Sequence, residues 1–265
     1  MHVIGIIIMV SKELQAALDA AEAAAEVIRA LYGRAVGVHL KPDQSPVTEA
    51  DVRSEEAIRA ILSERFPSYG FYGEETGQHD MGAEHIWLVD PIDGTKCFVR
   101  ECPFFSTQIA LVRDGRLVLG VSSAPVYGEL AWAEEGKGAY LNGRPIRVSD
   151  IKDLARATVS GGNLKSLARS RLWSGFGDLV GRANSTRGYG DFVHYHLLAR
   201  GALDVVIESD VNILDIGALT VIVREAGGNF TDLDGHEVDL DTISVLATNG
   251  PLHHEVREVL GSGRA

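Results

Sequence analysis

The chain has 265 residues, of which 45% are hydrophobic, and it carries a formal net charge of −12. This length and hydrophobic content suffice for a large buried core. The acidic charge argues against nucleic acid and against an anionic membrane surface as partners, because both are bound by a surplus of Lys and Arg. A small phosphorylated metabolite remains a possible partner if metal ions supply positive charge locally.

The first ten residues are apolar, but they are too short to span a bilayer and lack the basic start of a signal peptide. We expect residues 1–10 to form a disordered extension and residues 11–265 to form one domain, with sub-domains possible at about 11–150 and 151–265. Cys97 and Cys102 do not have a redox or zinc spacing, so two free thiols in a reducing cytoplasm are expected.

The N-terminal third predicts two helices. Apolar residues recur at helical spacing over 14–31, and Gly33 follows as a stop signal. Thr48-Glu49-Ala50-Asp51 resembles a capping box with Asp51 in the reciprocal position. This box predicts a second helix that ends before Pro67.

From about residue 86 to residue 148 the pattern is that of β-strands, with segments 106–112 and 117–124 joined by a hairpin turn. Asn142-Gly143 indicates a further turn. Helix and strand signals then alternate over 164–172, 191–200, 203–208, 215–226, 243–247 and 251–260. Leading helices, an antiparallel middle and later alternation predict an α+β fold built in layers.

Two carboxylates stand at the end of an apolar run, in Asp90-Pro91-Ile92-Asp93-Gly94-Thr95. Pro91 is expected to stop the strand from continuing as a central member of a sheet, and Asp93 to return to the side of Asp90. Gly94 and Thr95 offer free backbone N–H groups where a helix can begin. This arrangement predicts a divalent-cation site beside a phosphate site, although Asp-Pro and Asp-Gly are also common turn pairs.

A second acidic cluster, Gly73-Glu74-Glu75, precedes this segment, and Leu214-Asp215 leads to Glu225-Ala226-Gly227-Gly228. In order and spacing, the three segments resemble the three signatures of the inositol monophosphatase superfamily over about residues 11–260. The resemblance implies an α-β-α-β-α layered sandwich, a magnesium-dependent phosphomonoesterase and a cytoplasmic homodimer. The apolar region 104–124 also favours a homodimer.

The resemblance assigns metal ligands. Glu74, Asp90 and the carbonyl group of Ile92 correspond to a first metal site, and Asp90, Asp93 and Asp215 to a second. Oxygen ligands alone suit Mg²⁺ better than Zn²⁺, so we expect two or three Mg²⁺ ions, with Mn²⁺ as a possible substitute.

Several residues are expected to act around the metals. Thr95 would orient the attacking water, with Glu74 as its partner and possible base and Asp51 steadying Thr95. The N–H groups of Gly94 and Thr95 would bind phosphate, although Thr95 can equally be a helix cap. Lys41 belongs to a loop that the family places over the site as a lid, and a solvated surface lysine is the equal alternative.

On the substrate side we expect Arg187, Asp191 and Glu208 to contact the substrate together with the metal ligands Asp93 and Asp215. The two acids could bind a polyol hydroxyl or a cationic group. Asp191 could instead only cap the helix that begins there, which is the commoner use of such a residue.

The segments Gly94–Arg100 and Arg187–Phe192 are most similar to the histidinol-phosphatase branch, which implies histidinol phosphate as substrate. Inositol 1-phosphate is the runner-up, followed by fructose 1,6-bisphosphate and 3′-phosphoadenosine 5′-phosphate. A non-catalytic metal- or phosphate-binding protein is disfavoured because no ligand is missing. Leu214 and Gly217 depart from the family pattern, and a glycine in a helix costs up to about 1 kcal/mol against alanine, so we expect the Asp215 helix to be less rigid.

Overall fold

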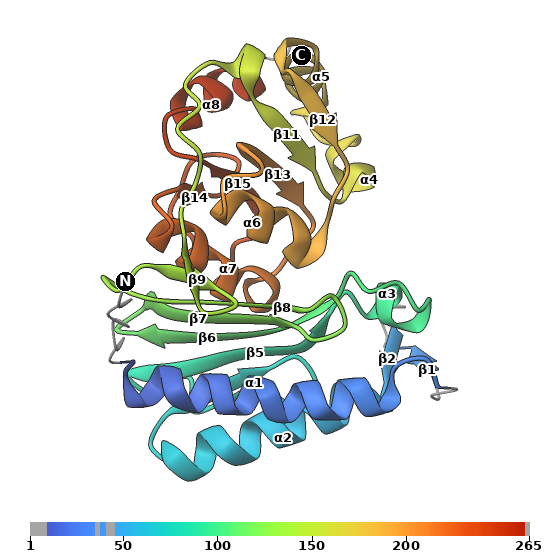
Figure 1. The fold of residues 1–265 in the computed structure, drawn as a ribbon, viewed down its shortest axis with the longest axis vertical. Helices are drawn as coiled ribbons and strands as arrows, with labels where there is room; N and C mark the ends of the chain where they lie inside the picture. Colours follow the sequence, from blue (N-terminus) through green and yellow to red (C-terminus); the bar gives the residue numbers. More distant parts are fainter. Residues whose placement is uncertain (1–9, 35–37, 41–45, 263–265) are drawn as a thin grey trace, which may run out of the picture.

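The computed structural model describes residues 10–34, 38–40 and 46–262. Its elements form five layers: a helix pair, a large sheet, a second helix pair, a smaller sheet and an outer group of helices (Figure 1). This confirms the predicted α-β-α-β-α sandwich. Residues 1–9 and Lys41 lie outside the described residues, and the division into sub-domains stays a prediction.

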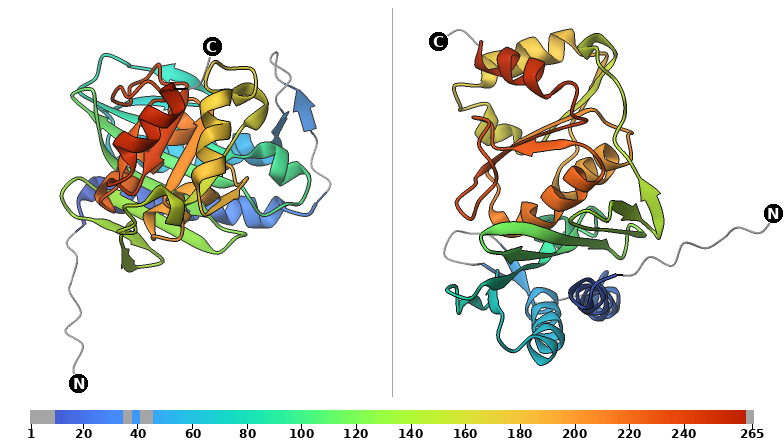
Figure 2. Two further views of the ribbon diagram at one scale, coloured as in Figure 1. Left: turned by 90° about the horizontal axis from the view of Figure 1, so that it is seen from above. Right: turned by 90° about the vertical axis from the view of Figure 1, so that its left-hand side faces the viewer.

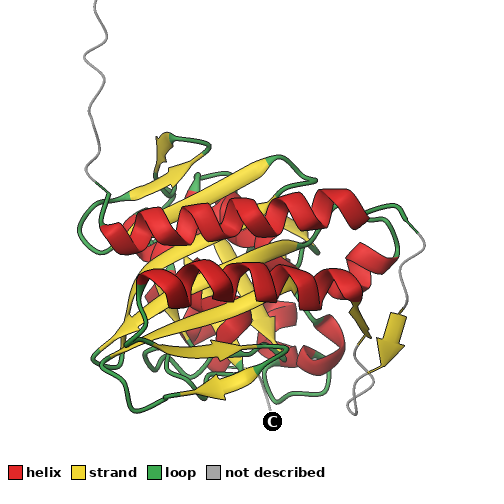
Figure 3. Ribbon diagram, turned by 90° about the horizontal axis from the view of Figure 1, so that it is seen from below, coloured by secondary structure: helices red, strands yellow, loops and turns green. Residues whose placement is uncertain are grey.

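The first layer consists of α1 (Lys12–Leu31) and α2 (Glu49–Arg65), as predicted from their spacing and caps. They lie side by side across one face of the large sheet (Figure 3). The predicted capping box is present: the Asp51 carboxylate accepts hydrogen bonds from the backbone N–H and the hydroxyl of Thr48, at 2.8 and 2.6 Å. The box fixes Asp51 at the start of α2, where it is buried.

The large sheet has eight strands in the order β10-β9-β8-β7-β6-β5-β3-β4. Only β3 and β5 run parallel, and the other neighbours are antiparallel. A separate two-stranded ladder joins β1 (Val38–Leu40) to β2 (Pro46–Thr48). The large sheet is made of β3 (Gly70–Gly73), β4 (Gly77–His79), β5 (His85–Asp93), β6 (Ser106–Arg113), β7 (Arg116–Ala124), β8 (Glu129–Glu134), β9 (Ala139–Leu141) and β10 (Arg144–Ile146).

Strand β5 corrects one expectation, because it continues past Pro91 to Asp93. Its pairing with β6 shifts register between Asp90 and Asp93, which is where a proline without an N–H group is tolerated. The Thr107 hydroxyl donates to the Pro91 carbonyl at 2.8 Å, and the Ile92 N–H donates to the Asp90 carboxylate at 2.9 Å. The irregularity matters for the site, because residues three apart on a regular strand point to opposite faces.

The middle layer contains α6 (Asp191–Ala199) and α7 (Ile213–Glu225) between the two sheets (Figure 1). Helix α7 packs very closely on the large sheet: a Cβ atom built on Gly120 would lie 2.2 Å from the Ala218 carbonyl oxygen. Gly217 faces Ala110 and Leu117 in the same interface, with 3.3 Å from an added Cβ to the Ala110 methyl group. Gly217 therefore has a packing role that the sequence did not reveal.

The smaller sheet has the order β12-β11-β13-β15-β14, in which β11 runs parallel to both neighbours and β15 is antiparallel to both of its own. The outer helices cover its far face (Figure 2). The remaining elements are a 3₁₀ turn (Leu154–Arg156), β11 (Thr158–Gly161), α4 (Leu164–Leu167), α5 (Trp173–Arg182), β12 (Ser185–Arg187), β13 (Val205–Ser209), β14 (Asn229–Thr231), β15 (Ser244–Thr248) and α8 (His253–Gly261).

Most predicted elements after residue 150 are confirmed within two residues or so, but the region 158–187 was predicted poorly. The signal over 164–172 corresponds to a helix of one turn, α4, and the sequence missed β11, α5 and β12. Within the described part of the chain, no helix has the length and apolar character needed to cross a membrane.

Candidate active site

A cavity of about 460 Å³ is lined by the end of β5 and the residues just after it on one side, and by α6, α7 and the end of β13 on the other. Eight of the predicted site residues line it: Glu74, Asp90, Asp93, Gly94, Thr95, Asp191, Glu208 and Asp215. Carboxylates dominate its lining, and among the described residues one lysine accompanies them. The acids come from the ends of β3 and β5 in the first half of the chain and from α6, β13 and α7 in the second half. The lining acids are Glu74, Asp90, Asp93, Asp191, Glu208, Asp210 and Asp215, and the lysine is Lys96.

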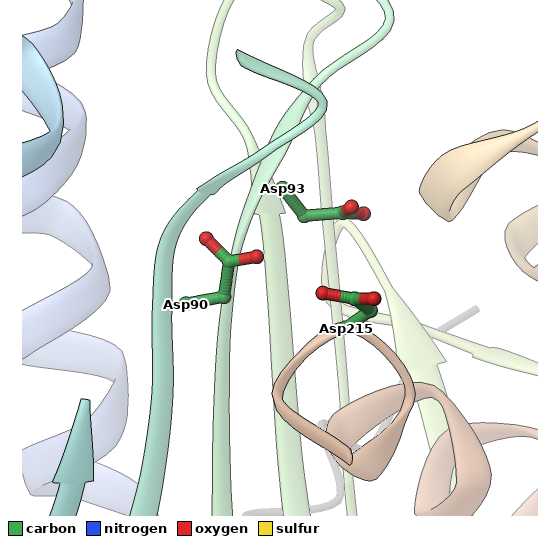
Figure 4. A group of neighbouring side chains, drawn as sticks. All are labelled: Asp90, Asp93 and Asp215. Atoms are coloured by element: carbon green, nitrogen blue, oxygen red, sulfur yellow. The ribbon is translucent and has the colours of Figure 1, made fainter. Parts of the chain in front are cut away.

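Asp90, Asp93 and Asp215 form the tightest group (Figure 4). One carboxylate oxygen from each lies within 4.8 Å of the others, which matches oxygen ligands around a shared cation. The register shift in β5 brings Asp93 to the side of Asp90, as the sequence predicted. Glu74 lines the same cavity, because its N–H bonds to the Val89 carbonyl at 3.1 Å and so continues the pairing of β3 with β5.

The electrostatics of this group favour a cation. Burial raises the pKa of Asp90 well above its usual value, and the neighbouring carboxylates of Glu74, Asp93 and Asp215 raise it further. The pKa of Asp93 is also raised, first by burial and then by Asp191 and other acids. Burial raises the pKa of Asp215 to about 7, with Glu74 adding to the shift. Such repulsion between crowded acids is relieved when a divalent cation binds them.

Asp215 is held in place by the start of its own helix. It occupies the reciprocal position of a second capping box, in which its Oδ2 accepts the Asn212 backbone N–H at 2.9 Å. The Asn212 side-chain amide donates to Oδ1, also at 2.9 Å. Two donors therefore fix the carboxylate, and the backbone N–H of Asn212 opposes the rise of its pKa that burial causes.

Thr95 and Asp51 meet next to this group. The Thr95 hydroxyl lies 3.1 Å from Asp51 Oδ1 and 3.0 Å from the Ile92 carbonyl oxygen. Burial raises the pKa of Asp51, and hydrogen bonds from Thr48 oppose the shift. The first turn of α2 is thus linked through Asp51 to the first residue of α3 (Thr95–Val99), although the two lie 44 residues apart in the chain.

Gly94 permits the turn between β5 and α3. Its φ of +90° is unfavourable for other residues, and a Cβ atom there would lie 2.9 Å from the Phe104 carbonyl oxygen. Gly94 and Thr95 line the cavity together with Cys97. Burial raises the pKa of the Cys97 thiol to about 12, and the nearby Asp191 contributes, so the thiol is protonated at neutral pH and unsuited to act as a nucleophile.

On the opposite wall, Asp191 and Glu208 face the same cavity. Asp191 is the first residue of α6, but Gly190 is the N-cap and makes no side-chain capping bond, so the capping alternative is wrong. Asp191 has a φ of +50°, a left-handed conformation that is uncommon outside glycine. Burial raises its pKa to about 6, and the charge of Glu208 adds to the shift.

Three predicted site residues of the described chain are not among the residues that line the cavity: Asp51, which contacts Thr95, and also Ile92 and Arg187. Arg187, on the edge strand β12, is exposed, and its guanidinium donates to the carbonyl of the preceding Thr186. Ile92 is buried, with only its carbonyl oxygen reaching Thr95. The sequence could not separate Arg187 from Asp191, because Arg187 ends β12 and Asp191 follows only four residues later.

The sequence missed His194 and Tyr195, which are buried on α6 and bind Glu208. Their only signal was the presence of polar atoms within an otherwise apolar helix. It also gave no role to Asn163, Asp210 and Asn212, which line the cavity from loops.

Residues 9–261 match the model of the inositol monophosphatase family. A histidinol-phosphatase from Mycobacterium tuberculosis is 40% identical over 257 residues, which cover 95% of this chain and 98% of that protein. The structure of the extragenic suppressor protein suhB from Bartonella henselae matches with a TM-score of 0.88 and 30% identity, covering 96% of this chain and 100% of that one. An inositol monophosphatase structure from Zymomonas mobilis matches with a TM-score of 0.82 and 32% identity, covering 94% and 96%.

The fold, the acidic cavity and the family match over residues 9–261 all support the same assignment. The chain belongs to the inositol monophosphatase family. It is a metal-dependent phosphomonoesterase that acts on a small phosphorylated compound. The prediction of a phosphatase is therefore confirmed over that of a non-catalytic binding protein.

Proposed function

We propose that the enzyme uses Mg²⁺ to hydrolyse histidinol phosphate to histidinol and inorganic phosphate. The observation that carries this proposal is the surplus of negative charge in the cavity. In the part of the chain that the structure describes, seven carboxylates and one lysine line it, and four of the carboxylates belong to the predicted metal ligands. The remaining acids would give a cationic substrate a favourable environment after the metals are bound.

Glu74, Asp90, Asp93 and Asp215, with the Ile92 carbonyl, are the residues that would hold two or three Mg²⁺ ions. Their donor atoms are all oxygens, which Mg²⁺ prefers. Bound Mg²⁺ would supply positive charge for the phosphoryl oxygens and lower the pKa of water. Mn²⁺ also accepts oxygen ligands and is the expected substitute.

Thr95, Asp51 and Gly94 would serve the reacting groups. The Asp51 carboxylate and the Ile92 carbonyl hold the Thr95 hydroxyl, which would orient the attacking water. The N–H groups of Gly94 and Thr95, at the start of α3, would bind phosphate oxygens. Glu74 is the candidate base, because it lines the cavity beside Asp90.

The substrate's ammonium and imidazole groups would face Asp191 and Glu208. The charge of Glu208 raises the pKa of Asp191, so the two carboxylates are close enough to interact. A cation between them would be bound by both. Inositol 1-phosphate is the second candidate, since the same acids can accept hydrogen bonds from hydroxyl groups. The likeness to the Zymomonas mobilis inositol monophosphatase favours that alternative.

Phosphate release from histidinol phosphate, inositol 1-phosphate, fructose 1,6-bisphosphate and 3′-phosphoadenosine 5′-phosphate tests the substrate. We expect the highest kcat/KM for histidinol phosphate. Faster hydrolysis of inositol 1-phosphate would transfer the assignment to the second candidate. The metal is tested in the same assay, because activity that survives EDTA treatment without added Mg²⁺ would contradict the proposed cofactor.

We also propose that the enzyme is a homodimer in the cytoplasm. The apolar hairpin 104–124 supports this less than expected, because β6 and β7 are largely buried between helical layers. Two exposed aromatic rings, at the start of this region and just after it, support it better: Phe104 and Tyr127 are 40% and 37% exposed, and their ring centroids lie 5.8 Å apart. Sedimentation at micromolar protein should give twice the 28.5 kDa chain mass, and a monomer would contradict the proposal.

A further inference from the structure

Glu208 lines the cavity, and neighbouring side chains hold its carboxylate in place. It is buried, and its Oε2 accepts two hydrogen bonds, from the Tyr195 hydroxyl at 2.7 Å and from His194 Nε2 at 2.9 Å. Both donors come from adjacent residues of α6, whereas Glu208 belongs to β13. No hydrogen bond to Oε1 occurs within the described part of the chain.

His194 is itself oriented by a chain of hydrogen bonds. Its Nδ1 lies 3.4 Å from the Ser160 hydroxyl, and the Ser160 oxygen accepts the Tyr189 backbone N–H at 3.2 Å. Because Ser160 accepts that N–H, its own hydrogen is available for His194 Nδ1. Because the Glu208 carboxylate can only accept, the hydrogen of the bond between His194 Nε2 and Glu208 lies on Nε2, which makes His194 the donor.

Gly162 limits the position of Glu208 from the other side. A Cβ atom on Gly162 would lie 2.1 Å from Glu208 Oε1 and 3.0 Å from His194 Cε1. The Gly162 N–H bonds to the Ile207 carbonyl at 2.9 Å, so the backbone there cannot easily move away. Any side chain at position 162 would therefore push the carboxylate of Glu208 from its place.

We infer that His194, Tyr195 and Gly162 are positioning residues that fix the Glu208 carboxylate as the recognition point for the positively charged group of the substrate. This inference rests on the proposed function. The Tyr195 hydroxyl and His194 Nε2 both orient Oε2 of the carboxylate, which leaves Oε1 without a hydrogen bond within the described part of the chain and able to contact a cation. A flexible carboxylate would lose side-chain entropy on every binding event, and a fixed one avoids that cost.

The test uses two substitutions that leave Glu208 in the protein. Tyr195→Phe removes one donor and keeps the ring, and Gly162→Ala displaces the carboxylate. Tyr140→Phe and Gly181→Ala are matched controls: Tyr140 stacks on Trp132 in the outer part of the large sheet, and a Cβ on Gly181 would meet nothing within 4 Å. Each protein is assayed on histidinol phosphate and on glycerol 2-phosphate, which has no cationic group.

We expect Tyr195→Phe to raise the KM for histidinol phosphate about tenfold, the usual effect of losing one hydrogen bond to a charged group, with a much smaller change in kcat. Gly162→Ala should raise this KM at least as much. Glycerol 2-phosphate should lose about twofold in kcat/KM, and the controls should match the wild type on both substrates. Equal losses on the two substrates, or a fall in melting temperature with an unchanged KM ratio, would overturn the positioning role.

The proposed function is judged separately, from the wild-type enzyme alone. If the wild type does not prefer histidinol phosphate, the proposed substrate and this inference both fail. If it does prefer histidinol phosphate and both variants keep that preference, only the positioning role is wrong.

Discussion

The two walls of the cavity are built in different ways. On the wall of the large sheet, Asp90 and Asp93 come from one strand, and a single irregularity turns both toward the cavity. On the opposite wall, Asp191 and Glu208 come from a helix start and a separate strand, and partners on α6 hold Glu208. A short motif therefore specifies the first wall, while the second exists only after the smaller sheet has folded. The first wall should serve every substrate, and the second should choose among them.

The largest effect is expected from Asp90→Asn. Asp90 lies in the tight group of three carboxylates and is predicted to bridge both metals, so kcat/KM should fall by about a thousandfold or more on all substrates, equivalent to about 4 kcal/mol. Steady-state assays and isothermal titration with Mg²⁺ measure the two consequences. Asp178→Asn, at an exposed acid on α5, is the control. A loss on one substrate only would contradict the expectation that the wall of the large sheet serves every substrate.

Asp191→Asn should distinguish the roles of the two walls most clearly. If Asp191 pairs with the ammonium group in a desolvated site, histidinol phosphate should bind less well by roughly 2–5 kcal/mol. A generic phosphate ester should be hydrolysed almost as before. Comparison of kcat/KM on the two substrates decides the matter, and equal losses would make Asp191 a structural residue.

Thr95→Ala should reduce kcat by roughly a hundredfold, within the range of aimed proton-transfer groups. The loss should be smaller than that of Asp90→Asn, because the metal ligands remain, and it should affect all substrates alike. Thr95→Ser keeps the hydroxyl that reaches Asp51 and should recover most of the rate. Wild-type turnover by Thr95→Ala would show that the water-orienting role is wrong.

Gly120→Ala should disturb the packing of α7 on the large sheet, which joins the two walls of the cavity. The added methyl group would collide with the Ala218 carbonyl, and such overpacking typically costs about 1–3 kcal/mol. Because Ala218 follows Asp215 on α7, the change should also weaken Mg²⁺ binding. Chemical denaturation and Mg²⁺ titration measure both, with Gly181→Ala as the control. Lower stability with unaltered Mg²⁺ affinity would show that the packing of α7 on the large sheet does not affect the metal site.

The smallest effect concerns pH and metal together. The pKa of Asp215 is raised to about 7 in the folded protein, so the stability it contributes is present below its ordinary pKa and is lost as pH rises through 7. The metal-free enzyme should lose roughly 1 kcal/mol between pH 6 and pH 8 from this group. Added Mg²⁺ should therefore raise the melting temperature more at pH 8 than at pH 6. An equal rise at both pH values would contradict the expected proton–metal competition.

The sequence predicted the first wall of the cavity better than the second. The helices 12–31 and 49–65 and the hairpin of β6 and β7 were predictable because caps, periodicity and turn residues are local signals. The acids of β5 were predictable from one motif. The role of His194 was not, because its meaning depends on Ser160 and Glu208, which lie 34 and 14 residues away. The exposure of Arg187 likewise depends on β12 being an edge strand, which no local signal revealed.

Asp51, Asp191 and Asp215 share one feature: each lies in the first turn of a helix that begins at this cavity or next to it. The peptide dipoles of a helix place about half a positive charge at its N-terminus. Three such termini would offset roughly one and a half of the seven carboxylate charges. Unlike Mg²⁺, this contribution cannot be removed by a chelator. The metal-free enzyme thus keeps a built-in positive contribution that partly offsets the crowded acids until metal and phosphate arrive.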